Sequence, residues 1–406
     1  MDAFSQIQTW SRNRFVAAFL ALVCLEPALS APLTRWLRHR RWFSDWEAVV
    51  CAGRALHLGQ NPYSEHLACP GLDPAAFVYM PQIARAFAPV TGWLGVEGAR
   101  WLGLAVILPA TAYLIWYVLV RRFAHLPLSA RLMGFAAVRG STLSTANVGF
   151  AMQALAVWAS LTLRKARWPF VAAVIAGALI KPIFLANLLV LLVEDRPIAD
   201  RLKAFGVSAF AGLAAVAVMM VTAGPLLHDW MTMLHQVVLT EQPGVGFAKL
   251  ATFVGLNNSG APALILYAVL SAALVAAAMA IAEWGELAAD ERVFLGLGLA
   301  QLINPRINDY DLYLLMPALA LAALALRRRA PVMFRRMSWL YVAVAVGNVL
   351  AVTIPVKALN HVPGTYAGAC ALVLTSAVAL ALPHRAALQR QVSQTLAAMP
   401  GWRRAS

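Results

Sequence analysis

Apolar runs long enough to cross a lipid bilayer recur along most of this 406-residue chain, and no other feature restricts its fold as strongly. An α-helix crosses the hydrocarbon core of a bilayer with about 20 apolar residues. Hydrophobic residues make up 61% of the sequence and charged residues only 13%, which is too little charge for a soluble enzyme of this length. The sequence therefore predicts an all-α, polytopic membrane protein with about twelve membrane helices, two of them half-length.

Short basic loops between the apolar runs predict which ends of the helices face the cytoplasm. Arginine and lysine cluster at 121–122, 164–167, 327–329 and 335–336. By the positive-inside rule, these loops and both termini face the cytoplasm. The polar loops 33–98, 225–261 and 304–311 then face the outside. We expect one transmembrane domain over residues 1–383, followed by a basic cytoplasmic tail over residues 384–406.

Two observations on charge qualify this topology. The net charge of +15 is spread over short loops and not over a folded basic face, which argues against nucleic-acid binding. Arginines at 35, 38, 40 and 41 depart from the positive-inside rule, because they follow the first span on the side predicted to be outside. They form either an interfacial collar on lipid phosphates or an attractive patch for an anionic lipid substrate.

The stretch Phe43–Pro81 is the first large polar loop, and it contains an acid near a predicted helix start. Ser44 and Glu47 fit a capping box, which places Asp45 in the first turn of a helix that ends near Gly59. Its apolar face predicts a helix lying on the membrane surface. Two cysteines at 51 and 69 share this loop and could pair if it is extracytoplasmic, although sequence says nothing about their distance. No Cys and His cluster with metal-ligand spacing is present.

Lys181 and Arg139 are the cations whose positions within apolar sequence call for an anionic partner. The segments 168–180 and 183–193 are each too short to cross the membrane, and both outer ends are basic. We expect a hairpin with Lys181 at its tip, where either a phosphate or the membrane interface accounts for it. Arg139 is either functional or a residue near a helix end that reaches water. In the second polar loop, His228 and Asp229 are expected to form a helical turn.

Several motifs, taken in order, resemble the bacterial mannosyltransferases of glycosyltransferase family 87, which are integral-membrane enzymes of the GT-C type. They are FSDWEA, LGQNPY and FVYMP in the first loop, Lys181-Pro182 between short helices, Asn257-Asn258-Ser259, and the turn that begins Asn304-Pro305-Arg306. Together they cover residues from about 10 to 330. The sequence departs from that family near Asn147, where many relatives have a Gly-Gln pair, and at 309–311, where many have a histidine.

The resemblance implies transfer of a hexose, mannose in that family, from a polyprenyl-phosphate donor to a glycan or glycolipid acceptor. The anomeric centre is inverted, and the active site faces the extracytoplasmic side of the bacterial inner membrane. Asp45 matches the catalytic acid of the family, and inversion requires one general base. No metal or cofactor is expected. Candidate donor-phosphate ligands are Lys181, Arg306 and Arg139, and weaker substrate-binding candidates are Tyr63, Tyr79, Asn147, Asn258, Asp309 and Tyr310.

Other interpretations stay open on sequence alone. Tyr63 and Tyr79 either stack on a sugar or anchor the chain at the interface. A transporter or flippase of a lipid-linked or small anionic substrate is the alternative function, although internal repeats and paired charges at mid-span are not evident. A catalytically inactive assembly partner is a further alternative. Asp45 itself would also suit the positive end of the helix dipole without any catalytic role.

Overall fold

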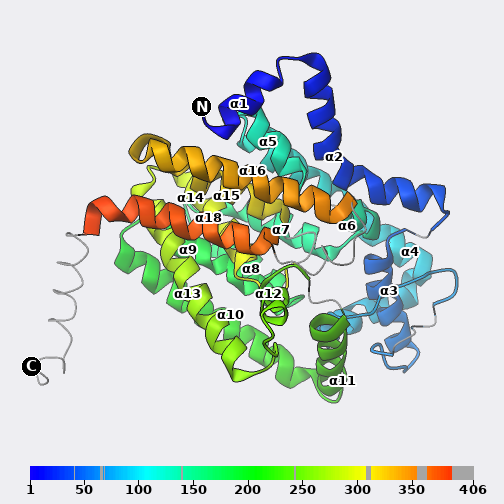
Figure 1. Ribbon diagram of the computed structural model, residues 1–406. Coiled ribbons are helices and arrows are strands. Elements are labelled where there is room, and N and C mark those ends of the chain that lie inside the picture. The colour runs from blue at the N-terminus through cyan, green and yellow to red at the C-terminus, as the bar shows by residue number, and fades with distance from the viewer. Residues whose placement is uncertain are drawn as a thin grey trace, which may run out of the picture.

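The computed structural model describes residues 1–40, 42–64, 67, 69–138, 140–241, 244–307, 312–353 and 364–385, and these ranges contain helices and no strands (Figure 1). Five helices within them are long and apolar enough to cross a membrane. The prediction of a multi-pass, all-helical membrane protein is therefore confirmed, although fewer segments reach full spanning length than expected. The five candidate spans are α2 (Arg14–Leu37), α4 with η1 (Pro81–Arg122), α10 (Ile198–Ala223), α13 (Ala261–Trp284), and α18 with η4 (Gly364–His384).

The remaining helices are shorter or carry more charge. Those before α10 are α1 (Ala3–Trp10), α3 (Ser44–His57), α5 (Leu128–Phe135), α6 (Gly140–Thr145), α7 (Val148–Ser160), α8 (Trp168–Ala178), η2 (Pro182–Leu189) and α9 (Val190–Val193). Those after α10 are α11 (Leu226–Met233), η3 (Leu234–Glu241), α12 (Phe247–Phe253), α14 (Ala289–Leu302), α15 (Leu312–Arg329) and α16 (Pro331–Thr353).

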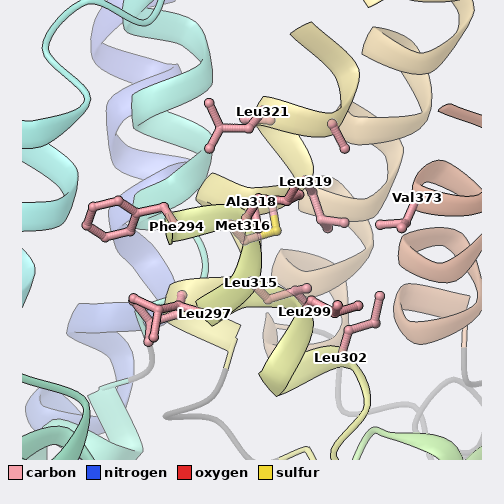
Figure 2. Packing of buried hydrophobic residues seen from close by; sticks show 14 of the residues in the cluster. Phe294, Leu297, Leu299, Leu302, Leu315, Met316, Ala318, Leu319, Leu321 and Val373 are labelled. Carbon is pink, nitrogen blue, oxygen red and sulfur yellow. The ribbon is translucent and has the colours of Figure 1, made fainter. Parts of the chain in front are cut away.

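The helices divide into an exposed apolar periphery and a buried centre. Only 11%, 17% and 22% of the most apolar stretches of α2, α10 and α13 are buried inside the protein. The exposed remainder is apolar surface that lipid tails can cover. By contrast, every residue from Leu312 to Ala323 in α15 is buried. Figure 2 shows α15 packed against α14, with Leu315 beside Leu299. A Cβ at Gly298 would lie 2.1 Å from the Ala318 side chain, so a small residue permits this close approach.

The predicted hairpin around Lys181 is confirmed. α8 ends at Ala178, η2 begins at Pro182, and the two pack against each other with Lys181 in the turn between them. At its base, Arg167 donates to Glu194 and to Asp200, which joins the two ends of the hairpin.

Two segments in the first half of the chain are broken or kinked helices. The segment 130–146 divides into α5 and α6, which is consistent with its many polar side chains. α4 begins at Pro81, inside the predicted loop 33–98. Gly95 has a φ of 68° and kinks α4, so that its first part covers α3 and its second part continues as a span. α3 lies on the side of the molecule opposite to the C-terminal end of α18 (Figure 1).

The three polar loops predicted to be outside contact one another. Asn61 Nδ2 donates to Asp229 Oδ2 at 2.9 Å, which joins the first loop to the second. The Val245 amide donates to the Ile307 carbonyl at 2.8 Å, which joins the second loop to the third. The pairing of loops that are far apart in sequence indicates that they lie at one end of the helix bundle.

At the ends that lie opposite to these polar loops, α7 and the α8–η2–α9 hairpin carry a network of ion pairs that we call the arginine band. Arg201, only 3% exposed, pairs with Glu283 and donates to the Leu192 carbonyl. Arg122 and Arg164 share the carboxylate of Asp290. These residues lie in or beside the loops that the positive-inside rule places in the cytoplasm. The band consists of Arg122, Arg164, Arg167, Arg201, Arg292, Arg328 and Arg329 with the carboxylates of Glu194, Asp195, Asp200, Glu283, Glu286 and Asp290.

Candidate functional site

The first turn of α3, which contains Asp45, is attached to the distant turn between α6 and α7. The N-cap residue of α3 is Phe43, whose φ of 70° lies in the left-handed region. The Phe43 amide donates to the Ser144 carbonyl at 2.7 Å. Ser44 is thus inside the helix, and no side chain caps it. The backbone contact with Ser144 fixes where the helix starts, so Asp45 faces the α6–α7 turn.

Glu47 does not complete the predicted capping box. Its carboxylate accepts hydrogen bonds from Arg100 Nε at 2.9 Å and from the Asp73 amide at 3.2 Å, and the Glu47 side chain is 2% exposed. A charge-assisted bond to a guanidinium stabilises a buried carboxylate better than a neutral backbone donor does. The prediction of a surface helix is also wrong, because α3 is buried on most sides against α4. Trp46 packs directly over Gly103, where any Cβ would overlap the indole ring.

Asp45 is half-buried, and its carboxylate is held by two neutral donors. Thr145 Oγ1 donates to Asp45 Oδ2 at 2.9 Å, and Asn147 Nδ2 donates to the same oxygen at 2.7 Å. Both donors come from the α6–α7 turn, about a hundred positions away along the chain. The position of Asp45 in the first helical turn adds a favourable interaction of its negative charge with the helix dipole. The carboxylate therefore accepts two neutral hydrogen bonds, and no ion pair is found among its described partners.

Asn147 connects Asp45 to Lys181. It is the N-cap residue of α7, and its Oδ1 accepts from the Gly149 amide at 2.8 Å. The same Oδ1 lies 3.5 Å from Lys181 Nζ. The amide of Asn147 thus presents its NH₂ group to Asp45 and its oxygen to Lys181. One side chain joins the predicted base to the predicted phosphate ligand.

Lys181 and Tyr79 are adjacent. Lys181 Nζ lies 4.9 Å from the centroid of the Tyr79 ring, within the range of a cation–π contact. Tyr79 is 3% exposed, so its ring is a wall beneath the ammonium group and not a free platform for stacking. We name Asp45, Thr145, Asn147, Lys181 and Tyr79 the Asp45 site.

Tyr63 contacts Tyr79 through a hydrogen bond. It is 6% exposed, and its phenol OH donates to the Tyr79 carbonyl at 2.7 Å. Burial raises the pKa of the Tyr63 phenol, so the group stays protonated as a donor. Tyr63 therefore has a packing role in this structure, and the Phe77 ring makes tilted contacts with the rings of both Tyr63 and Tyr79.

A small cavity borders Lys181. It has a volume of ≈ 20 Å³ and is lined by Lys181, Asn187, Gln301 and Asn304 together with apolar side chains. That is room for about one water, so a phosphate would require the walls to move. The Arg306 amide donates to Asn304 Oδ1 at 3.0 Å, which places the backbone of Arg306 on the turn beside this cavity. Contacts thus link Asp45 to Asn147, Asn147 to Lys181, and Lys181 to the turn that contains Asn304.

The other candidate residues are not placed in this site. Arg139, Asp309 and Tyr310 lie outside the described residues. Asn258 donates to Thr252 Oγ1 at 3.2 Å, and in the described part of the chain none of its hydrogen bonds reaches Asp45 or Lys181. His228 and Asp229 form the first turn of α11, as expected, where Asp229 accepts from Asn61.

Cys51 and Cys69 form a disulfide, with 5.7 Å between their Cα atoms. The bond attaches the 60–80 loop to α3, and the Ala75 amide, which donates to the Ser44 carbonyl at 3.0 Å, adds a second attachment. Over the same described ranges, no group of three His, Cys, Asp or Glu residues is arranged to hold a metal ion.

A larger cavity of ≈ 640 Å³ lies at the other end of α7 and does not include Asp45. Its charged walls are members of the arginine band, including Arg122, Glu194 and Asp290. Because these groups neutralise one another, we place the candidate site at Asp45, where the described partners of the charged groups are neutral, in spite of the larger volume elsewhere.

Thr145 is the site residue that sequence reasoning did not single out, although it belongs to a polar run, Ser144 to Asn147, in an otherwise apolar region. That run was the available signal. Comparison with family models, with curated proteins and with solved structures finds no match to this chain. The resemblance to family 87 therefore has the motifs quoted above as its support.

Proposed function

We propose that this protein is a membrane glycosyltransferase that moves a hexose, mannose by the family resemblance, from a polyprenyl-phosphate donor to a glycan or glycolipid acceptor with inversion. The observation that carries this proposal is the connection of Asp45 to Lys181 through the single side chain of Asn147. A general base and a cation joined through one side chain suit such a transfer: one accepts the acceptor's proton, and the other stabilises the leaving phosphate.

The reaction balances with these groups. The acceptor hydroxyl oxygen forms a bond to the anomeric carbon while its proton moves to the Asp45 carboxylate. The bond between the anomeric carbon and the phosphate oxygen breaks, and its electron pair leaves with the polyprenyl phosphate. The added negative charge on that phosphate is stabilised by Lys181, with Arg306 as a second candidate. A phosphate is already a good leaving group, so no general acid is required at that oxygen.

Two observations support an extracytoplasmic site. The Cys51–Cys69 disulfide lies in the loop that contains Asp45, and disulfides persist in oxidising compartments outside the cytoplasm. The arginine band lies at the other end of α7, a helix of 13 residues, hence about 20 Å away along its axis. The positive-inside rule places that basic end in the cytoplasm. The donor would then be a lipid of the outer leaflet, which reaches the site from the bilayer.

The test measures transfer of radiolabelled mannose from polyprenyl-phosphate mannose to endogenous acceptors in membranes that contain the protein. We expect wild-type membranes to transfer label and Asp45→Asn membranes to lose the transfer, with an unchanged thermal midpoint in detergent. Asp73→Asn is the matched control, because it makes the same change on an exposed carboxylate of the same loop. Full transfer by folded Asp45→Asn would remove the catalytic assignment. Movement of labelled lipid across proteoliposomes without any transfer would favour the transporter or flippase instead.

A further inference from the structure

We propose that Thr145 and Asn147 are positioning residues that hold one carboxylate oxygen of Asp45 and so reserve the other, Oδ1, for the acceptor hydroxyl. This inference rests on the proposed function, because it assigns a role to the neighbours of the base proposed there. It also changes the role expected for Asn147, which the sequence suggested as a substrate ligand.

The two donors converge on a single oxygen. Thr145 Oγ1 and Asn147 Nδ2 lie 2.9 and 2.7 Å from Oδ2 of Asp45. Among the described residues, none donates a hydrogen bond to Oδ1. An ionised carboxylate has about four lone-pair positions shared by two oxygens, so occupation of one oxygen leaves the other able to accept a proton. Asp45 is half-buried, and Oδ1 belongs to a side chain that solvent or substrate can still reach.

The direction of the Asn147 amide is determined by its other end. Its Oδ1 accepts from the Gly149 amide at 2.8 Å and faces the Lys181 ammonium group at 3.5 Å. Both of those groups are donors only, so the amide oxygen must face them and the NH₂ group must face Asp45. The Asn147 amide is therefore held by α7 and by the α8–η2 turn together. Because both are rigid elements, the amide donates to Asp45 in a fixed direction.

The backbone supports the same geometry. Between the two donors, Ala146 has a φ of 51°, a left-handed conformation that is unfavourable for a residue with a Cβ. The Phe43 amide, bonded to the Ser144 carbonyl, holds the start of α3 against this turn. The turn therefore adopts a costly conformation in which residues 145 and 147 both point to Asp45. Backbone strain of this kind is typical of sites where orientation matters.

A purely structural role is the competing explanation, because the same hydrogen bonds attach α3 to the α6–α7 turn. The two roles differ in what they predict. A structural role lowers the amount and the thermal midpoint of the protein and leaves turnover per folded molecule unchanged. A positioning role lowers kcat for the transfer while the KM for the lipid donor stays the same, because neither hydroxyl nor amide contacts the donor in this account.

The experiment compares Thr145→Val with Thr145→Ser, using the transfer of label from polyprenyl-phosphate mannose to endogenous membrane acceptors. Valine has the shape of threonine and lacks the donor, whereas serine keeps the donor. We expect Thr145→Val to lower kcat by about 10²-fold, the loss that a small misplacement of a reacting group produces, with unchanged KM for the donor. Thr145→Ser should recover most of kcat.

Asn147→Ser provides a second measurement. Serine is a good N-cap residue and so preserves the start of α7, but it has no amide to donate to Asp45. Asn13→Ser is its matched control, because Asn13 is the N-cap residue of α2 and lies away from the site. We expect a loss of kcat for Asn147→Ser and wild-type kcat for Asn13→Ser.

The results separate this inference from the proposed function. If wild-type membranes transfer no label, the proposed function fails, and if Asp45→Asn transfers label normally, the catalytic role of Asp45 fails. If Asp45→Asn is inactive but folded Thr145→Val and Asn147→Ser keep the wild-type kcat, only the positioning role is overturned. A rise in KM for the donor with unchanged kcat would also overturn it, because the two side chains would then be substrate ligands.

Discussion

Charged side chains have different kinds of partners in the Asp45 site and in the arginine band. In the band, guanidinium groups face carboxylates, and several carboxylates serve two arginines, as Asp290 does for Arg122 and Arg164. In the Asp45 site, the carboxylate accepts from the neutral donors Thr145 and Asn147, and the described partners of Lys181 include an amide oxygen and an aromatic ring.

This difference separates charges that serve stability from charges that can serve chemistry. Opposite charges that neutralise each other hold helix ends together, and removal of one leaves the other unpaired. In the proposed reaction, the Asp45 carboxylate accepts a substrate proton, and Lys181 attracts the donor phosphate. We therefore expect changes in the band to lower stability and changes in the Asp45 site to lower activity. The four predictions below test that division, from the largest expected effect to the smallest.

Arg201→Met should destabilise the protein by about 3–4 kcal/mol, because it removes two charge-assisted bonds of a buried guanidinium, one to Glu283 and one to the Leu192 carbonyl, although Glu283 keeps Arg292. The measurement is the thermal midpoint in detergent, together with transfer activity per folded molecule, which should be unchanged. Lys203→Met is the control, since Lys203 is an exposed cation on the same helix. A specific loss of activity in a stable Arg201→Met protein would contradict the division between the two regions.

Lys181→Met should lower kcat by about 10²–10³-fold, the usual cost of removing one group that stabilises a developing negative charge. Stability should change little, because a methionine fits the apolar hairpin tip beside Ile183 and Phe184. Transfer kinetics and the thermal midpoint are measured on the same preparation. Lys181→Arg, which keeps the positive charge, should retain more activity than Lys181→Met; equal loss in both would argue against an electrostatic role.

The double substitution Cys51→Ser with Cys69→Ser should destabilise the region around Asp45 by about 2–4 kcal/mol, the usual contribution of a disulfide that closes a loop of this length. The thermal midpoint is compared for the variant and for the wild type with and without a thiol reductant. The reductant should lower the midpoint of the wild type and leave that of the variant unchanged. Cys24→Ser with Cys370→Ser is a control on cysteines that are not bonded to each other.

Ala146→Gly should raise the stability by up to about 1 kcal/mol, because glycine adopts the left-handed conformation of residue 146 without a Cβ clash. Ala146→Val should lower it, since a β-branched residue fits that conformation least well. Thermal midpoints of both variants suffice as the measurement. If glycine lowers transfer while it raises stability, the strained turn contributes to orienting Thr145 and Asn147.

Much of the framework was predictable from sequence. The apolar runs around Arg14–Leu37, Ile198–Ala223 and Ala261–Trp284 indicated spans, because bilayer thickness sets a length that can be read directly. The tip of the hairpin at Lys181 followed from two segments that were too short to cross and were basic at their outer ends. The end of α3 near Gly59 followed from a turn residue, and Gly59 has a φ of 72°.

The sequence by itself thus determined a helical membrane protein with its polar loops at one end, since hydrophobic length and basic loops act over neighbouring residues. Only the tertiary structure decided which side chains meet. Asp45 contacts Thr145 and Asn147, and Glu47 binds Arg100 instead of capping its own helix. The partners in these contacts are about fifty to a hundred positions apart. Whether such groups come within hydrogen-bond distance depends on how kinked and broken helices pack, and no local pattern encodes that packing.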